Sequence, residues 1–214
     1  LKQLSQSGAK IILLTHIGEK GESLSPVAHH ATETLPFISF TESKEFNELQ
    51  EKISTLQNGD ALLLENVRLF EGETDGSDSL AEAFASLGDV FINNAFSVAH
   101  RKHSSVTGIP KYRISYFGPT FEHELKHLTE ALTPKAPALL VVGGAKIATK
   151  LTLIKHYLDQ GVKVFVGGAM VHNIWKERGL EIGESLYDPE YHLPETFYRH
   201  PLLLTPIDVV LESG

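Results

Sequence analysis

The sequence contains no cysteine among its 214 residues. Disulfide bonds, thiolate nucleophiles and cysteine-ligated zinc sites are therefore excluded for these residues. The absence of cysteine fits the reducing environment of the cytosol, and we expect a cytoplasmic protein.

Long hydrophobic segments and an excess of positive charge are also missing. The longest apolar runs, such as residues 11–14 and 61–64, are far shorter than the roughly 20 residues of a membrane-spanning helix. The chain has 19 Lys and Arg residues against 27 Asp and Glu residues, which gives a formal net charge of −8. We therefore expect neither a membrane nor a nucleic-acid partner, and any anion site must be a local basic cluster.

Short β-rich runs alternate with amphipathic helical patterns along the chain. Strands are predicted at residues 10–15, 61–64, 89–93, 138–142, 163–166 and 202–205. Helices are predicted near residues 26–34, 44–55, 78–87, 147–159, 170–178 and 189–198. Continuous apolar strands that are separated by helices favour parallel βαβ units with both faces of each sheet covered.

A further predicted helix, residues 121–132, lies between two proline-containing segments. "GPT" precedes it at residues 118–120, and "PKAP" follows it at residues 134–137. Because proline interrupts regular structure, its presence on both sides indicates a joint between two α/β units.

The sequence His123-Glu124-x-x-His127 on this helix matches the zinc peptidase motif, in which two histidines bind the metal. At 100° per residue the histidines lie opposite a predicted core-facing stripe, which consists of Phe121, Leu125, Leu128 and Leu132. No third ligand is indicated, and a chain with 11 histidines matches the motif easily by chance. We therefore predict a solvated helix face and no metal ligands, with a zinc peptidase as the remotest alternative.

Two other segments follow predicted strands, at the edge of the sheet where open α/β folds bind ligands. One carries Arg68 within "ENVRLF", and the other carries Arg101 within "NNAFSVAHRKHSS". The two guanidinium groups can form a clamp for phosphate or carboxylate, although two ordinary surface arginines remain an equal alternative. His100 and His103 lie three residues apart, but without a third ligand they support a metal site only weakly.

The segment "VVGGAKIATK" places Gly143 and Gly144 between a predicted strand and a predicted helix start. Backbone N–H groups in such a turn can approach a phosphate closely, and Lys146 adds a positive charge. Gly167 and Gly168 occupy the equivalent position after the next strand. Each glycine pair alone more often reflects helix–strand packing, but together they predict two walls of one nucleotide pocket.

Four segments resemble phosphoglycerate kinase in order and spacing: "LLLENVRLFEGE", "FINNAFSVAHRKHSSVTGI", "GGAKIATKL" and "VGGAMVHNIWKERGLEIGESL". The resemblance extends over essentially the whole chain. It implies an α/β fold with two Rossmann-like parallel-sheet domains, each of three αβα layers, joined by a long helix. The implied boundaries are 1–118 for a phosphoglycerate-binding domain, 119–133 for the interdomain helix and 134–214 for a nucleotide-binding domain.

The resemblance also implies an activity in glycolysis. Phosphoglycerate kinases transfer a phosphoryl group reversibly between 1,3-bisphosphoglycerate and ADP, which gives 3-phosphoglycerate and ATP. The nucleotide is held as its Mg²⁺ complex, and the protein ligand of the ion is expected outside this chain. A monomer is expected. Phosphoryl transfer requires mainly positioning and charge stabilisation from a protein, which suits the basic residues noted above.

Residue roles are implied by the matched positions. The expected phosphoglycerate ligands are His16, Gly18, Arg68, His100 and Arg101. The expected nucleotide-binding residues are Gly143, Gly144, Lys146, Lys150, Gly167 and Gly168. The expected catalytic residues are Lys146, which resembles the lysine that steadies the transferring phosphoryl group, together with Arg68 and Arg101.

The sequence departs from the family pattern at several positions. Glu19 stands where the family has a phosphate-facing arginine, which reverses the charge. Asn94, Ser97 and Ala169 replace the more usual Asp, Gly and Gly, and Thr149 stands where Asp is common.

The chain begins with Leu rather than Met, and family segments with further ligands are expected before residue 1 and after residue 214. Both domains are therefore expected to be incomplete here, and these 214 residues alone are expected to show little or no kinase activity. Family-like turnover in a coupled ATP-consumption assay would contradict that expectation. The alternative is a non-catalytic relic that binds an anionic metabolite or a partner.

Overall fold

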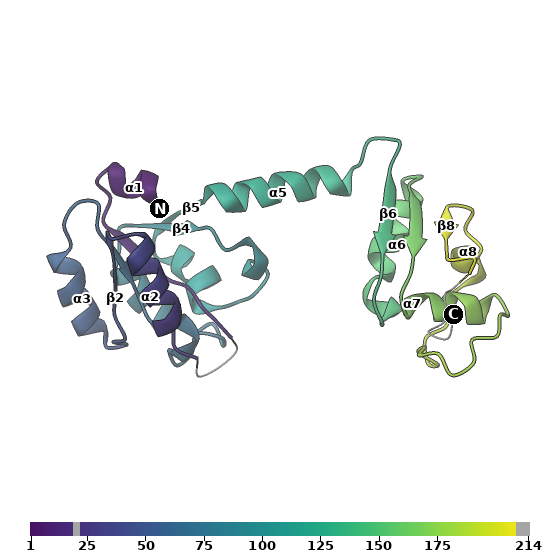
Figure 1. Cartoon of the computed structure of the whole chain (residues 1–214), viewed down its shortest axis with the longest axis horizontal. Helices are drawn as coiled ribbons and strands as arrows, with labels where there is room; N and C mark the ends of the chain where they lie inside the picture. The colour runs from purple at the N-terminus through teal and green to yellow at the C-terminus, as the bar shows by residue number, and fades with distance from the viewer. Residues whose placement is uncertain (19–21, 209–214) are drawn as a thin grey trace. The chain divides into compact units, whose positions relative to one another are not determined.

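The computed structural model describes residues 1–18 and 22–208, and Figure 1 shows their helices and strands. The chain forms two compact units, Leu1–His127 and Leu128–Gly214. No helix in the described part of the chain is both long and apolar enough to cross a membrane. Glu19, the predicted charge reversal, lies outside the described residues.

The described strands of the first unit run parallel and form two sheets. Their order is β1-β3-β2 in one sheet and β4-β5 in the other. The strands are β1 (Ile11–Leu13), β2 (Ile38–Phe40), β3 (Ala61–Leu63), β4 (Val90–Asn93) and β5 (Ile114–Phe117). Parallel strands require crossover connections, which helices supply here.

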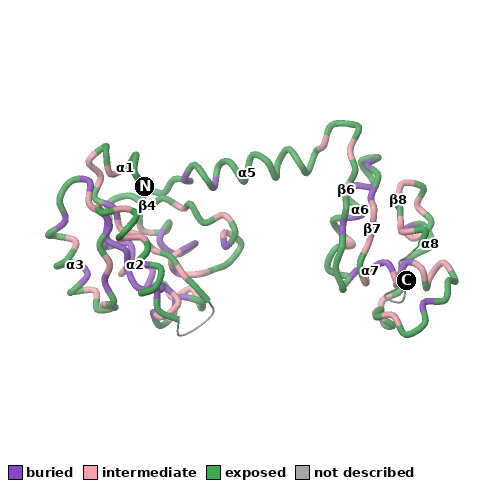
Figure 2. Tube along the Cα trace, in the orientation of Figure 1, coloured by how far each residue is buried: buried purple, intermediate pink, exposed green. Residues whose placement is uncertain are grey.

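Helices cover both faces of the three-stranded sheet. They are α2 (Ser25–Thr34), α3 (Phe46–Thr55) and α4 (Asp78–Ser86), whereas α1 (Lys2–Gln6) contains no buried residue. Short helical turns lie at Val67–Leu69, Phe96–Val98, Ser104–Gly108 and Ile109–Lys111. Ala61 and Leu63 pack with α2, whereas Leu62 between them packs with α3 and α4. This alternation is the two-residue period of a β-strand. Figure 2 shows buried residues in the interior of this unit; β1, β2 and β3 contain such residues, whereas β4 and β5 contain none.

An aromatic cluster closes the α3–α4 side of this sheet. The ring centroids of Phe84 and Phe70 are 5.0 Å apart, and those of Phe84 and Phe46 are 5.5 Å apart. Phe70 directly follows the helical turn that carries Arg68, and Val67 of that turn belongs to the same buried cluster. Packing against α4 therefore positions the Arg68 turn.

The second unit contains one parallel sheet with the order β6-β7-β8. Its strands are β6 (Leu139–Val142), β7 (Lys163–Val166) and β8 (Leu203–Leu204), and its helices are α6 (Leu151–Asp159), α7 (Met170–Glu177) and α8 (Glu195–Tyr198). Val164 and Val166 of β7 are fully buried, in one cluster with Ile154 of α6 and Ile174 of α7. The middle strand therefore lies at the centre of this core.

Most predicted elements are confirmed, and the differences have physical causes. The strands β2 ("ISF") and β5 ("ISYF") were not predicted, because a serine interrupts the apolar run in each. The helix predicted at 189–198 is shortened to α8, which begins directly after Pro194, since proline restricts the residue before it.

Helix α5 (Pro119–Leu132) crosses the boundary between the two units. The prediction that its four apolar residues all pack into a core is wrong for three of them, because Leu125, Leu128 and Leu132 remain 43%, 47% and 46% exposed. Phe121 is buried, and its ring centroid lies 4.2 Å from that of Phe117. Periodicity shows which residues share a stripe, but burial requires an element packed against that stripe.

The N-terminus of α5 is capped by a residue from a distant strand end. Asn94, which directly follows β4, accepts hydrogen bonds through Oδ1 from the backbone N–H groups of Thr120 (2.9 Å) and Phe121 (3.2 Å). These bonds satisfy two of the donors that have no partner inside the helix. Gly118 is required beside it, because a Cβ at this position would lie 2.4 Å from Asn94 Oδ1.

We expect Asn94→Ala to destabilise the first turn of α5 by about 1 kcal/mol, the usual cost of losing an N-cap acceptor. Asn94→Asp keeps the acceptor and adds a negative charge near the helix N-terminus, so it is expected to stabilise this turn by about 0.3–1 kcal/mol. Amide hydrogen exchange of residues 120–123 measures both effects. Equal exchange rates in Asn94→Ala and the wild type would rule out the capping role.

Candidate functional site

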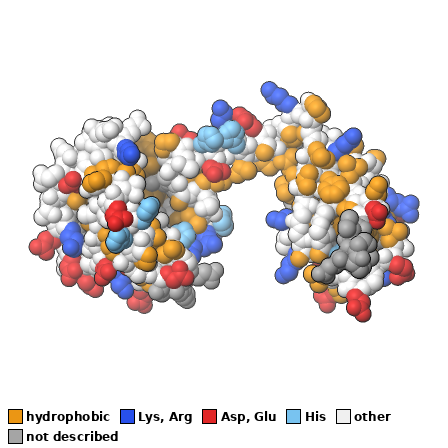
Figure 3. All heavy atoms as spheres, in the orientation of Figure 1, with side chains coloured by type: hydrophobic (Ala, Val, Ile, Leu, Met, Phe, Trp, Pro, Cys, Tyr) orange, Lys and Arg blue, Asp and Glu red, His pale blue; other side chains and the backbone are white. Residues whose placement is uncertain are grey.

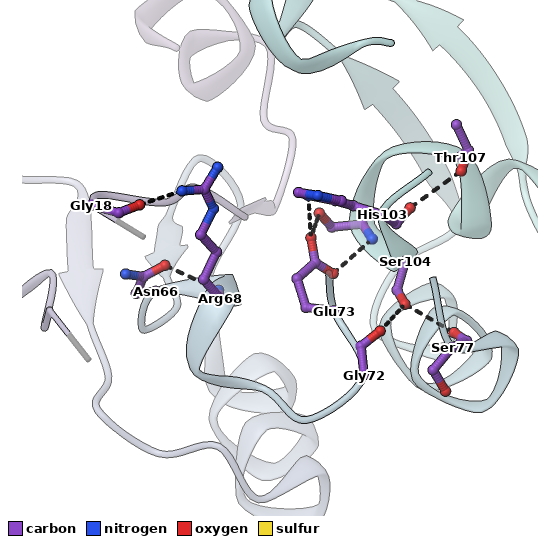
Figure 4. Close-up of polar contacts among 10 residues, drawn as sticks. Gly18, Asn66, Arg68, Gly72, Glu73, Ser77, His103, Ser104 and Thr107 are labelled. Carbon is purple, nitrogen blue, oxygen red and sulfur yellow. Dashed lines mark hydrogen bonds and ion pairs between the residues drawn. The ribbon is translucent and has the colours of Figure 1, made fainter. Parts of the chain in front are cut away.

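The loops that follow β1 and β3 are tied together by side chains. Asn66 donates through Nδ2 to the backbone carbonyls of Ile17 and Glu22, both at 2.8 Å. Arg68 donates through Nη1 to the carbonyl of Gly18, as Figure 4 shows. The loop after β3 thus holds the backbone of the loop after β1 on either side of Gly18.

The buried carboxylate of Glu65 fixes the end of the same loop. It accepts hydrogen bonds from Ser23 Oγ (2.6 Å), Leu24 N (2.7 Å) and Asn66 N (2.6 Å). Burial alone would raise the pKa of Glu65, but these hydrogen bonds and the charge of Lys44 outweigh it and leave the pKa below its ordinary value. Glu65 therefore acts as a charged anchor for the loop that carries the predicted ligands.

A basic cluster gathers side chains from the ends of three strands. Burial lowers the pKa of His16, and the positive charges of Arg68, Arg101 and His103 lower it further. Burial also lowers the pKa of His103, followed by the charges of Arg101, Arg68 and His100. These five residues come from the loops that follow β1, β3 and β4, and we call them the basic cluster.

A buried acid lies beside one end of the basic cluster. Glu73 is 1% exposed, accepts hydrogen bonds from the N–H (3.0 Å) and the hydroxyl of Ser105, and lies 3.7 Å from His103 through Oε1 and Nδ1. Burial raises the pKa of Glu73, although the bonds from Ser105 and the charge of Arg68 act in the opposite direction. Ser104 N also donates to the carbonyl of Glu73 at 3.0 Å. Figure 4 shows how these contacts hold the backbone next to His103.

All five predicted anion ligands are brought to the carboxyl ends of parallel strands: His16, Gly18, Arg68, His100 and Arg101. Gly18 takes part through its backbone, with φ of +61°. His103 joins them, although the sequence indicated it only as half of a weak metal pair. Its position two residues after Arg101, in the same loop, is the signal that identifies it.

The two glycine pairs of the second unit are in backbone contact. The end of β6 lies beside the end of β7, where Gly167 N donates to the carbonyl of Val142 and Met170 N donates to that of Gly144, both at 2.9 Å. Gly168 has φ of +64°, and a Cβ on it would lie 3.0 Å from Gly144 N and 3.1 Å from Gly144 O. A side chain at 168 would therefore require a strained backbone and a shift of the main chain.

Lys146 and Lys150 follow the first glycine pair and are exposed, as is Gly143, whereas Ile147 between the two lysines is buried. The prediction of a helix N-terminus at Lys146 is wrong, because a 3-10 turn (Ile147–Thr149) comes first and α6 begins only after Lys150. Thr149 Oγ1 donates to the carbonyl of Lys146 at 2.9 Å, a local bond that competes with a regular helix start. Lys146 is therefore not at the N-terminus of α6, and the positive end of the helix dipole does not add directly to its charge.

The described residues contain no group of three or more His, Cys, Asp or Glu side chains that could hold a metal ion. His123 and His127 are exposed on α5. His100 and His103 lie in the basic cluster, where the arginine charges oppose a cation. Nothing in the described residues favours the peptidase alternative.

The strands and loops define the class of protein. Parallel sheets with crossover helices make this a Rossmann-like α/β chain, with basic side chains or glycine turns at the strand ends. A sequence profile of the phosphoglycerate kinase family matches residues 1–213. The chain belongs to the phosphoglycerate kinase family, which confirms the resemblance of its motifs.

Individual relatives agree with this membership. The phosphoglycerate kinase of Bartonella tribocorum is 37% identical over 227 residues, which cover 99% of this chain and 57% of the relative. The structure of phosphoglycerate kinase from Coxiella burnetii shares 32% identity with a TM-score of 0.75, over 88% of this chain and 49% of that one. The phosphoglycerate kinase structure from Pyrococcus horikoshii OT3 shares 25% identity with a TM-score of 0.74, over 85% of this chain and 48% of that one. The chain therefore spans about half the length of the relatives it matches, and the predicted α/β fold is confirmed.

Proposed function

We propose that the chain supplies the phosphoglycerate site and part of the nucleotide site of a phosphoglycerate kinase. The reaction is the reversible transfer of the acyl phosphate of 1,3-bisphosphoglycerate to ADP, with 3-phosphoglycerate and ATP as products. Family membership supports this activity. As part of the same proposal, the enzyme is a cytoplasmic monomer of glycolysis.

The basic cluster is the observation that carries the proposal. The chain as a whole has a net charge of −8, yet burial lowers the pKa values of His16 and His103 and the positive charges of Arg68 and Arg101 lower them further. Positive charges that repel one another at a strand-end site are stabilised by a bound anion. A ligand with both a phosphate and a carboxyl group supplies that negative charge.

Arg68 offers a hydrogen-bond donor to such a ligand. Its backbone N–H donates to Asn66 Oδ1 (3.0 Å) and its Nη1 to the carbonyl of Gly18. Its Nε is the one buried side-chain nitrogen or oxygen without a hydrogen-bond partner in residues 1–18 and 22–208. An unpaired buried donor costs roughly 1–3 kcal/mol, so an oxygen of the ligand at Nε would stabilise the complex. We assign ligand binding to Arg68 and Arg101, with His16, Gly18 and His100 around them.

The nucleotide is assigned to the second unit. The glycine pairs 143–144 and 167–168 allow the backbone to approach the nucleotide, because they carry no Cβ. Lys150 is assigned to the nucleotide phosphates and Lys146 to the transferring phosphoryl group, and both lysines are exposed. These residues provide positioning and charge stabilisation, which is what phosphoryl transfer demands of a protein.

The Mg²⁺ ion that accompanies the nucleotide in this family supplies further neutralisation of phosphate charge when it is bound. The described residues contain no group of three ligands suited to it. We assign no residue of this chain to the ion.

Titration with 3-phosphoglycerate, followed through the backbone amide signals in two-dimensional NMR spectra, tests the first site. We expect saturable shifts in residues 15–18, 66–68 and 100–103, and separate shifts in residues 143–150 and 167–168 on titration with ADP. Lactate, which has the carboxylate and a hydroxyl group but no phosphate, is the control ligand. An equal response to lactate, or shifts spread evenly over the surface, would overturn the proposal.

Binding of 3-phosphoglycerate is expected to raise the pKa values of His16 and His103, since the anion offsets the nearby arginine charges. In the free chain both pKa values lie below the ordinary 6.5. Below pH 6.5 the unfolded chain therefore binds more protons at these two histidines than the folded chain does. Each histidine thus contributes stability above pH 6.5 that is lost as the pH falls through its folded pKa.

The imidazole C–H signals in NMR spectra, recorded against pH with and without 3-phosphoglycerate, measure this effect. We expect an upward shift of both titration curves in the wild type and a much smaller shift in Arg101→Ala, in which the ligand binds weakly. Unchanged curves at saturating ligand would show that the histidines are remote from it.

A further inference from the structure

His123 and His127, the histidines of the H-E-x-x-H motif, lie one turn apart on α5. Their Nε2 atoms are 3.2 Å apart, whereas their ring centroids are 4.3 Å apart. The two Nε2 atoms therefore lie closer together than the ring centres and within hydrogen-bond distance of each other. Both residues are exposed, and Figure 3 shows histidine side chains on the surface of this helix.

We propose that His123 and His127 form a two-nitrogen binding site for a transition-metal dication. Metal–imidazole bonds are roughly 2.0–2.1 Å long. An ion at that distance from both Nε2 atoms, which lie 3.2 Å apart, makes an N–metal–N angle of about 100°. This value lies between the square-planar and tetrahedral angles, so the helix already presents the two nitrogens at the spacing of adjacent ligands.

The donor set selects the class of metal. Imidazole nitrogen suits Cu²⁺, Ni²⁺ and Zn²⁺, whereas Mg²⁺ and Ca²⁺ prefer oxygen ligands. For nitrogen ligands the affinity of first-row dications is highest for Cu²⁺. The site therefore takes a borderline transition metal, and its nitrogen donors do not suit the Mg²⁺ that accompanies the nucleotide.

The site differs from a peptidase centre in its composition. No group of three metal-binding side chains exists among the described residues, so the protein contributes two ligands and water completes the coordination. The pair is exposed rather than enclosed in a pocket. The site binds a metal but lacks the dry, shaped cavity that metal-ion catalysis requires.

Metal binding is expected to stabilise α5. Phe121 is the one buried residue of this helix, so little of its stability comes from side-chain packing. An ion held by residues i and i+4 bridges two consecutive turns and binds only the helical form, which shifts the equilibrium toward the helix. The amide hydrogens of residues 119–132 are therefore expected to exchange more slowly when the metal is bound.

Titration of the whole chain with Cu²⁺ tests the site. Electron paramagnetic resonance reports the number of nitrogen ligands, and substoichiometric Cu²⁺ broadens the NMR signals of nearby residues. We expect two nitrogen ligands, with broadening first at residues 120–130. His123→Ala and His127→Ala are each expected to weaken this binding at least about tenfold, because a single imidazole remains. His30→Ala is the matched control, since it removes an exposed histidine of α2 that has no histidine three or four residues away.

A composition-preserving variant separates chelation from a general effect of histidine content. Exchanging two residues, His127→Thr with Thr129→His, moves one imidazole to another side of the helix and is expected to weaken binding as strongly as His127→Ala. Circular dichroism confirms that the helix is retained. Equal Cu²⁺ affinity in the wild type, His123→Ala and the exchange variant would overturn the proposal. Equal losses of Cu²⁺ affinity in His123→Ala and His30→Ala would also overturn the proposal.

Discussion

Arg68→Ala is expected to weaken 3-phosphoglycerate binding by about 100-fold. The guanidinium can donate two charge-assisted hydrogen bonds to the ligand, each contributing about 1.5 kcal/mol, and 1.4 kcal/mol corresponds to a tenfold change in affinity. Arg101→Ala is expected to have an effect of similar size. Arg68→Lys keeps the charge but loses the planar fork, so its affinity should fall between those of Arg68→Ala and the wild type.

Isothermal titration calorimetry at fixed ionic strength measures these affinities. Arg113→Ala is the matched control, because Arg113 belongs to the same unit but donates to the carbonyls of Gly88 and Tyr112. Thermal unfolding of each variant checks that losing the bond from Arg68 to Gly18 has not unfolded the unit. If Arg68→Ala stays folded and binds the ligand as well as Arg113→Ala does, the assignment of the basic cluster is wrong.

Phe84→Ala is expected to lower the unfolding free energy of the first unit by about 3–5 kcal/mol. Phe84 is 3% exposed and contacts both Phe70 and Phe46, so truncation removes apolar contacts and leaves a cavity under α4. Because Phe70 adjoins the turn that carries Arg68, 3-phosphoglycerate affinity should fall as well.

Native-state hydrogen exchange resolves this effect for each unit. In Phe84→Ala, the protection of β3 should fall while that of β7 remains unchanged. Ile154→Ala, in the core of the second unit, is the matched control and should give the opposite pattern at a cost of about 2–5 kcal/mol. Loss of protection in both units from either single variant would show that the two units unfold together.

The elements with continuous apolar runs could be predicted from the sequence, as β7 with its observed bounds Lys163–Val166 demonstrates. β2 and β5 could not, because their identity as strands depends on pairing with β3 and β4 rather than on their own pattern. The exposure of Leu125, Leu128 and Leu132 was not predictable either, since periodicity contains no information about the packing partner of a helix.

Motif positions indicated the arginines and glycines of the candidate site, but the residues that hold them were not predictable. Asn66 binds carbonyls of residues 17 and 22, which lie more than 40 positions earlier in the chain. Glu73 similarly contacts Ser105, 32 residues later. Such contacts arise from the crossing of loops at the strand ends, which no local sequence pattern encodes.

The sequence of this family member has little freedom to vary at position 168. A Cβ there would meet the main-chain N and O of Gly144, and every amino acid carries those atoms. By contrast, a Cβ at Gly108 would lie 2.5 Å from the Cβ of Ala81, which a change of Ala81 to glycine removes. The conflict at 168 has no such compensating side-chain partner, so a side chain there requires the main chain at Gly144 to shift by a few tenths of an ångström, in addition to the strained φ of +64°.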